Sequence, residues 1–269
     1  MPSVRILNPS RFFLLAGLVF FFGAGQLSFA AQEKWQKHKT LHYIIFYEEA
    51  PESFINNLGE EAEDLFGDTA DQMGFENYPP WRKNARIKIY VYNDRDHYEA
   101  GGRGNRREGT RAMAHVQKRA ISTFTQDRDS FLNATLPHEL AHIFFWEYVG
   151  VKADVPGWFA EGIAMMREKR DQQEREDFIR RLLEDRDYFS LEDIPLAKHT
   201  DLDYYYPVAY SATKYLLSRV QGNKLSRLFD LLKEGKSFEK ALSDVTNGNI
   251  PTIERLSEDW VEAVKEEGP

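Results

Sequence analysis

Residues 137–142 read Pro-His-Glu-Leu-Ala-His, and no other stretch of the chain constrains the fold as strongly. Two histidines four residues apart on a helix lie one turn from each other, so the imidazoles of His138 and His142 can reach one metal ion. Glu139 is offset from them by about 100° and can point along the same side of the helix, toward a water molecule beside the ion. The hexapeptide therefore predicts a helix that carries half of a metal site.

A third candidate ligand, Glu161, is separated from His142 by eighteen residues. Pro156 and Gly157 break the chain between them and let it double back, so that Glu161 falls on the next helix. A catalytic zinc site holds three protein ligands and leaves one position for water. The hexapeptide alone also arises by chance, but this carboxylate completes a His-His-Glu set. Because the chain contains no Cys, only His and carboxylate side chains can bind a metal here.

Pro137 bears on where the metal-binding helix begins. Proline lacks an N–H and fits the first turn of a helix. The sequence therefore predicts that His138 lies near the helix start, with Asn133 or Thr135 as the capping residue.

The periodicity of apolar residues predicts an α+β fold. Strands are expected at 41–48 and 86–93, with a helix between them at 51–73, and either two short strands or one broken strand at 112–125. Helices are expected at 131–149, 158–169, 170–188, 207–220, 225–233, 238–245 and 253–266. We therefore expect an N-terminal mixed α/β lobe with the metal-binding helix over 31–150. A helical C-terminal lobe over 151–269 would supply Glu161.

The first thirty residues have the layout of a secretory signal peptide. Arg5 and Arg11 precede an apolar run at 12–22, and Ser28-Phe29-Ala30 ends the segment with small residues at its two recognition positions. We expect cleavage after Ala30 and therefore an exported protein, either periplasmic or secreted. The alternative is an uncleaved anchor that attaches the protein to the membrane, because 12–30 is about long enough to span a bilayer.

The charge and composition exclude several classes of protein. The net charge is −8, and removal of the two arginines of the leader, which holds no acid, brings it to −10. An acidic chain of this kind does not suit a nucleic-acid binder, which needs a basic face. The absence of Cys excludes a disulfide framework, and an aromatic content of 14% predicts a well-filled core.

The two motifs together resemble the gluzincin metallopeptidases. The resemblance lies in the HExxH motif at 138–142, the eighteen-residue spacing and the run Gly-Trp-Phe-Ala-Glu-Gly-Ile-Ala at 157–164, which is similar in particular to the bacterial peptidase MA-like domain. It implies a zincin-like fold and one zinc ion per chain, held by His138, His142 and Glu161. It also implies that Glu139 is the general base. Metzincins are excluded, because they need Gly at Phe145 and His at Tyr148.

Gluzincins also supply a Tyr or His from the helical lobe to stabilise the oxyanion. The resemblance points to the run Tyr-Tyr-Tyr-Pro-Val-Ala-Tyr at 204–210, with Tyr206 as the first choice and Tyr210 as the second. Ordinary core packing is an equally open interpretation of either tyrosine.

Substrates of this class lie along an edge strand as an added strand, which we expect within 112–125. His115 in that segment is expected to be structural or to face the substrate. The arginine-rich stretch 100–111 is interpreted as a mobile flap, or as a segment that favours an anionic substrate.

Two departures from the family pattern affect the expected activity. The chain lacks the Gly-Ala-Met-Glu-Asn segment with which the aminopeptidase branch recognises a free amino terminus, so endopeptidase activity is favoured. Met165 stands where thermolysin-like enzymes carry an acid that orients a histidine, so the partner of His138 or His142 must come from elsewhere.

We therefore expect an exported zinc-dependent endopeptidase that acts on peptide or protein substrates. One alternative is a catalytically inactive zinc-binding envelope protein that serves as a scaffold or partner-binding module. Another is a membrane-tethered scaffold, if the leader is retained. Glu139 favours the enzyme, because a structural metal site does not need a base.

Overall fold

The computed structural model describes most of the chain. The described residues are 35–74, 86–101, 113–115, 118–125, 128–169, 171–184, 186, 189–194 and 202–266. The predicted signal peptide and the arginines of the predicted flap lie outside these residues. The backbone of His115 is described, but its side chain is not.

Near the N-terminus, five strands form one mixed sheet. They are β1 (Gln36–Lys39), β2 (Tyr43–Tyr47), β3 (Ile87–Tyr92), β4 (Met113–His115) and β5 (Ala120–Phe124). The order is β1-β2-β3-β5-β4, in which β2, β3 and β5 run parallel while β1 and β4 pair antiparallel at the two edges. In β3 the buried residues Ile87, Ile89 and Val91 alternate with partly exposed ones, so one face of the sheet contributes to the core. Helix α1 (Glu52–Gln72) makes the crossover that the parallel pair β2 and β3 requires.

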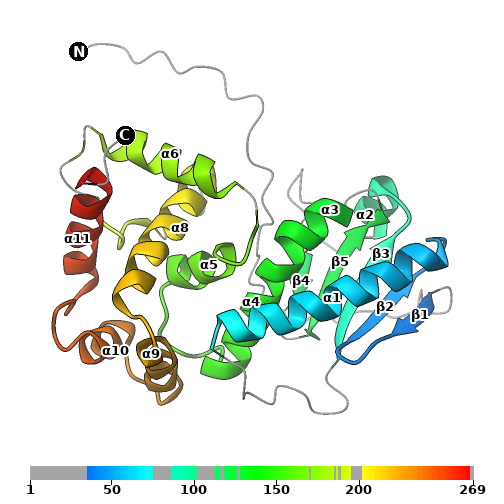
Figure 1. The fold of residues 1–269 in the computed structure, drawn as a ribbon, viewed down its shortest axis with the longest axis horizontal. Coiled ribbons are helices and arrows are strands. Elements are labelled where there is room, and N and C mark those ends of the chain that lie inside the picture. The colour runs from blue at the N-terminus through cyan, green and yellow to red at the C-terminus, as the bar shows by residue number, and fades with distance from the viewer. Residues whose placement is uncertain are drawn as a thin grey trace, which may run out of the picture.

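Most of the rest of the described chain is helical. The helices are α2 (Arg95–Gly101), α3 (Arg128–Ser130), α4 (Leu136–Val149), α5 (Gly157–Met165), α6 (Gln172–Leu183), α8 (Leu202–Arg219), α9 (Asn223–Lys233), α10 (Phe238–Val245) and α11 (Ile253–Glu266). Helix α4 packs against both α1 and α5, and α5 packs most extensively against α8. Figure 1 shows the sheet with α1 at one end of the molecule, α8 to α11 at the other, and α4 and α5 between them.

The metal-binding helix α4 is the continuation of a longer helical segment. A π-helical turn, Phe131–Thr135, joins α3 to α4, and the N–H of Leu136 donates to the carbonyl of Phe131 five residues earlier. The predicted cap is therefore wrong, because Thr135 has helical backbone angles and makes no side-chain cap bond, while Asn133 lies inside the π turn. Pro137 is tolerated after this turn even though it has no N–H to donate.

The proline leaves a carbonyl for another part of the chain. In a regular α-helix the carbonyl of Asn133 would accept from residue 137, which is a proline. Here it accepts from the backbone N–H of Lys169 at 2.8 Å. The segment that follows α5 is thereby attached to the start of the metal-binding helix.

A glycine sets the distance between α5 and α8. A Cβ atom at Gly162 would lie 2.0 Å from Oγ1 of Thr213 and 2.4 Å from the carbonyl oxygen of Ala209. Any side chain at this position would therefore collide with the backbone of α8. Because Gly162 directly follows Glu161, this close packing also fixes the third candidate ligand.

The structure confirms the predicted α+β, zincin-like arrangement, but it differs from the sequence-based boundaries in several places. Strand β1 and helix α2 were not predicted. Helix α8 begins at Leu202, five residues before the predicted start at Pro207, because burial of Tyr205 and Tyr206 keeps the preceding turns helical. Helix α5 ends at Met165 rather than near Lys169. No helix among the described residues is both long and apolar enough to cross a membrane.

Candidate metal centre

The three predicted ligands converge on one point inside the protein. His138 and His142 project from α4 and Glu161 from α5, and each side chain is only 1% exposed. The two Nε2 atoms lie 3.1 Å apart, and they are 3.6 Å and 3.4 Å from Oε2 of Glu161. Among the described residues, these three form the group that could hold a metal ion.

Zinc fits this geometry. Ligand atoms at about 2.0–2.1 Å from a tetrahedral zinc ion are about 3.3–3.4 Å from one another. The three measured separations, 3.1, 3.4 and 3.6 Å, bracket that value. The donor set of two imidazoles and one carboxylate is also that of catalytic zinc sites with three protein ligands.

The charges around the site also suit a divalent cation. Three buried carboxylates surround the two histidines, those of Glu139, Glu161 and Glu168, and Arg175 supplies one buried positive charge. With neutral imidazoles these groups sum to −2. Without a cation, bound protons must offset this excess of negative charge. Burial lowers the pKa of His138, but hydrogen bonds to Glu161 and Glu168 outweigh burial and raise this pKa to about 10.

Glu139 is the carboxylate beside the ligands. Its side chain is 1% exposed, and Oε2 has no hydrogen-bond partner among the described residues. Burial raises its pKa to about 7, helped by the charges of Glu161 and Glu168 and opposed by that of His138. A carboxylate with a free acceptor oxygen and a pKa near neutrality can take up a proton from a neighbouring molecule and release it again.

Glu168 is a functional candidate that the sequence did not identify. Nδ1 of His138 donates to Oε1 of Glu168 at 2.7 Å, and because a carboxylate only accepts, this nitrogen carries the hydrogen and Nε2 faces the site. Glu168 also accepts a hydrogen bond from Nη2 of Arg175. Burial raises the pKa of Glu168, but its bonds to His138 and Arg175 outweigh burial and hold that pKa below its usual value.

The position of Glu168 explains why the sequence pattern was not sufficient. The family acid is expected four residues after Glu161, where Met165 is instead fully buried in the core. Glu168 follows one turn later, in the segment between α5 and α6 that the N–H of Lys169 attaches to Asn133. Because Glu168 lies in a highly charged stretch, nothing in the sequence indicates that it is buried. Its hydrogen bond with His138 is apparent only in the folded structure.

The two tyrosines predicted for the oxyanion both lie on α8 and differ in what they contact. Tyr206 is 1% exposed, and its ring packs edge-on against that of Tyr205. Tyr210 is also buried, and its ring lies 5.4 Å from the guanidinium carbon of Arg175. Burial raises the pKa of Tyr210. The charges of Glu176 and Glu168 raise it further, whereas those of Lys214 and Arg175 lower it.

Tyr205 is a third candidate that was not singled out from the sequence. Its pKa is raised by burial and then by the charge of Glu161, which places its hydroxyl within electrostatic reach of the third ligand. A Cβ atom at Gly157, the first residue of α5, would lie 3.4 Å from this hydroxyl. The three consecutive tyrosines at 204–206 were the available signal in the sequence. Which of them faces the metal centre depends on their positions around α8, and the sequence-based prediction started this helix only at Pro207.

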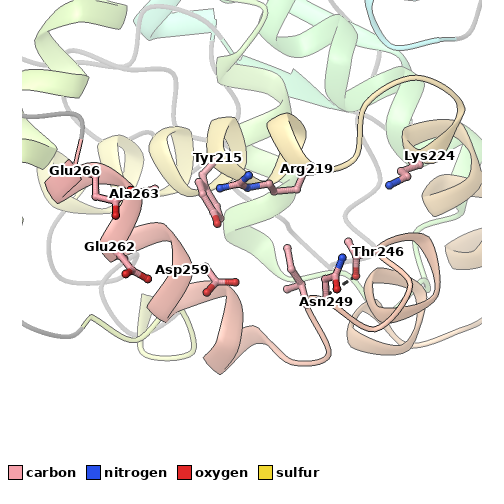
Figure 2. Close-up of a pocket in the computed structure, with 10 residues that line it drawn as sticks. Tyr215, Arg219, Lys224, Thr246, Asn249, Asp259, Glu262, Ala263 and Glu266 are labelled. Carbon is pink, nitrogen blue, oxygen red and sulfur yellow. Dashed lines mark hydrogen bonds between the residues drawn. The ribbon is translucent and has the colours of Figure 1, made fainter.

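A separate hollow of about 420 Å³ lies among α8, α9 and α11. Figure 2 shows Tyr215 and Arg219 on one side and Asp259, Glu262 and Glu266 of α11 on the other. None of the predicted site residues lines it.

The fold and this buried centre together define a zincin-like protein: a mixed sheet, a helix with two histidines, and a second helix that brings a carboxylate to them. The chain belongs to the peptidase MA superfamily, whose family model matches residues 80–266, more than half of the sequence and all of the metal centre. This membership supports peptidase activity in general terms. No curated protein matches the chain.

Proposed function

We propose that the protein is an exported zinc-dependent endopeptidase with its active site at the centre formed by α4, α5 and α8. The observation that carries this proposal is the convergence of His138, His142 and Glu161 next to Glu139, whose Oε2 has no hydrogen-bond partner in the part of the chain that the structure describes. A purely structural site would have four protein ligands and no need for a buried base. Membership of the peptidase MA superfamily supports the same conclusion.

The residues divide the chemistry among them. His138, His142 and Glu161 would hold a zinc ion, which would supply Lewis acidity toward a water molecule and the scissile carbonyl. Glu139 accepts the proton of the attacking water and passes it to the leaving amine, a role that suits its position beside the ligands and its pKa of about 7. Glu168 keeps the ring of His138 in the tautomer that presents Nε2 to the ion.

The test of this proposal is a pair of variants on the same helix. Glu139→Gln should keep one zinc ion per chain and abolish cleavage of a peptide library. The matched control is Glu147→Gln, two turns further along α4, where the carboxylate pairs with Arg119 away from the ligands. This control should cleave as the wild type does. Cleavage retained in Glu139→Gln would contradict the assigned base, and a zinc-loaded wild type that cleaves nothing would favour the inactive zinc-binding scaffold.

The oxyanion donor is assigned by comparing three single substitutions. Tyr205→Phe, Tyr206→Phe and Tyr210→Phe each remove one hydroxyl and leave the ring in place. Loss of an oxyanion donor lowers kcat by about 10²- to 10³-fold. The electrostatic influence of Glu161 on Tyr205 favours the first of these, whereas Tyr206 and Tyr210 remain the candidates that the sequence suggests. A variant whose kcat is unchanged carries a tyrosine that only packs.

The proposals of export and endopeptidase activity rest on sequence alone. Sequencing the amino terminus of the protein isolated from its native cells tests the leader, and a start at Ala31 supports cleavage after Ala30. Products that begin in the interior of a substrate support endopeptidase activity, and release of single terminal residues would contradict it.

A further inference from the structure

Arg175 is the most deeply buried charged group in the described chain outside the metal centre itself. It is 0% exposed, although it lies on α6, a helix whose other arginines reach solvent. Its Nη2 donates to Oε2 of Glu168, while Nε and Nη1 have no hydrogen-bond partner among the described residues. Burial of a guanidinium with so few partners is costly, so something at this position must compensate for it.

The compensation comes from Glu168, which serves two groups at once. One carboxylate oxygen accepts from Nδ1 of His138 at 2.7 Å, and the other accepts from Arg175. The ring of Tyr210, 5.4 Å from the guanidinium carbon, covers Arg175 on the α8 side. A continuous chain of contacts thus runs from α6 through Glu168 to a metal ligand on α4.

The backbone around Glu168 is held in place on both sides. The N–H of Lys169 donates to the carbonyl of Asn133 at 2.8 Å, and the carbonyl of Glu168 accepts from Nε2 of Gln172 at 2.8 Å. The side chain of Glu168 therefore has little freedom except rotation about its own bonds. Arg175 restricts that rotation by holding the oxygen that His138 does not use.

We propose that Arg175 is a positioning residue for the metal centre: it fixes Glu168, which fixes the ring of His138, so that helix α6 controls metal affinity although it carries no ligand. This inference rests on the proposed zinc site. Loss of Arg175 would leave one oxygen of a buried carboxylate without its donor. Glu168 would turn to seek another partner, and the ring of His138 would lose its fixed orientation.

A merely structural role for Arg175 predicts a different result. In that case its removal would lower the free energy of unfolding of the metal-free protein, and the folded molecules would bind zinc as before. The two roles are therefore separated by the zinc affinity of the folded protein, measured by competition with a chromophoric chelator. The visible absorption spectrum of the cobalt-substituted protein reports ligand geometry independently of activity.

The experiment compares Arg175→Met with Arg180→Met, a control on the same helix whose guanidinium pairs with Glu176 and Asp177 near the surface. Arg175→Met should weaken zinc binding by at least about tenfold and change the cobalt spectrum, the range expected when a group that orients a ligand is lost. Arg180→Met should leave both unchanged. Arg175→Met with the zinc affinity and spectrum of the control would overturn the proposal, however much stability it had lost.

A second variant covers the case in which Arg175→Met does not fold. In Glu168→Gln/Arg175→Met both charges of the buried ion pair are removed together, so neither is left without the other and this variant should fold. A neutral amide orients His138 less firmly than a carboxylate, and zinc affinity should again fall by about tenfold. Wild-type affinity in this double variant would overturn the proposal. A wild-type chain that binds no zinc would overturn the proposed function as well, whereas the other results concern only Arg175 and the carboxylate of Glu168 that it holds.

Discussion

Two regions of this protein gather acidic and basic side chains, and they differ in how those charges are satisfied. In and around the metal centre, His138, Glu139, His142, Glu161, Glu168 and Arg175 are all buried: the three candidate ligands converge on one point, and Glu168 accepts from both His138 and Arg175. In the hollow beside α11 (Figure 2), Arg219, Glu262 and Glu266 are exposed and Asp259 is partly exposed. Burial makes the first arrangement expensive unless a cation completes it, while water satisfies the second.

The pairing within each region shows the same difference. Asp259 in the hollow pairs with Arg255 one turn earlier on its own helix; Asp259 is half-buried and Arg255 is exposed, so water still reaches the pair and it contributes little to stability. Glu161 instead reaches from α5 to two histidines on α4. The metal centre differs from the hollow because its buried ligand atoms converge on one point, although the hollow is also lined by several helices.

The largest expected effect comes from removing the metal. A chelator should lower the unfolding temperature of the wild type by on the order of 10 °C, because a ligand present at 1,000 times its Kd stabilises by about 4 kcal/mol and each kcal/mol shifts a domain of this size by about 2–4 °C. His142→Ala should unfold at the lower temperature with or without chelator. Asp259→Ala in the hollow should show the full wild-type difference, which calorimetry would measure. Equal responses of the two variants would abolish the distinction between the regions.

The next effect tests the packing that holds Glu161 in place. Gly162→Ala puts a methyl group where Oγ1 of Thr213 and the carbonyl of Ala209 already lie, and overpacking of this kind costs about 1–3 kcal/mol. We expect lower stability in urea together with weaker zinc binding. Gly67→Ala on the exposed face of α1 is the matched control, since a Cβ there meets nothing within 4 Å. The control should be stabilised by about 0.5–1 kcal/mol. A stable Gly162→Ala would mean that α5 and α8 can separate at little cost.

Sequence reasoning selected the three candidate ligands that the structure brings together, because their signal is local. The spacing of His138 and His142 depends only on helix periodicity, and Glu161 follows from a chain reversal at Pro156 and Gly157. The sheet strands β2, β3, β4 and β5 were similarly predicted from alternation and β-branched content, which are properties of short segments.

The features that sequence reasoning missed depend on the whole fold. Glu168 and Arg175 lie in a stretch whose composition is that of a solvated surface, but both are buried in the fold, where α6 packs against α8 and α11. The π turn before α4 could not be predicted, because a proline at 137 usually marks the start of a helix. In the structure the helical segment begins earlier, and it accommodates the N–H that Pro137 lacks. Tertiary contacts therefore determine which residues surround the candidate ligands, whereas the candidate ligands themselves can be predicted from short sequence motifs.

A smaller effect is expected from restoring the missing donor in the metal-binding helix. In Pro137→Ala the new N–H can compete with that of Lys169 for the carbonyl of Asn133, so the segment that carries Glu168 is held less firmly. Zinc affinity should fall, but by less than the about 10- to 100-fold expected for loss of Glu168 itself. Pro251→Ala, at an exposed proline before α11, controls for the added flexibility of the unfolded chain. Unchanged zinc affinity in Pro137→Ala would show that the hydrogen bond from the N–H of Lys169 to the carbonyl of Asn133 does not depend on the proline.

The smallest effect should come from the hollow. Asp259→Asn removes one of the two carboxylates that pair with Arg255, and Glu262→Gln removes a neighbouring charge on α11. Because water still reaches these charges in the folded state, each change should alter the free energy of unfolding by no more than about 1 kcal/mol. Zinc affinity and peptide cleavage should remain at wild-type values. A loss of cleavage in either variant, with zinc still bound, would mean that the hollow contacts the substrate and that exposed charges of this protein also belong to a site.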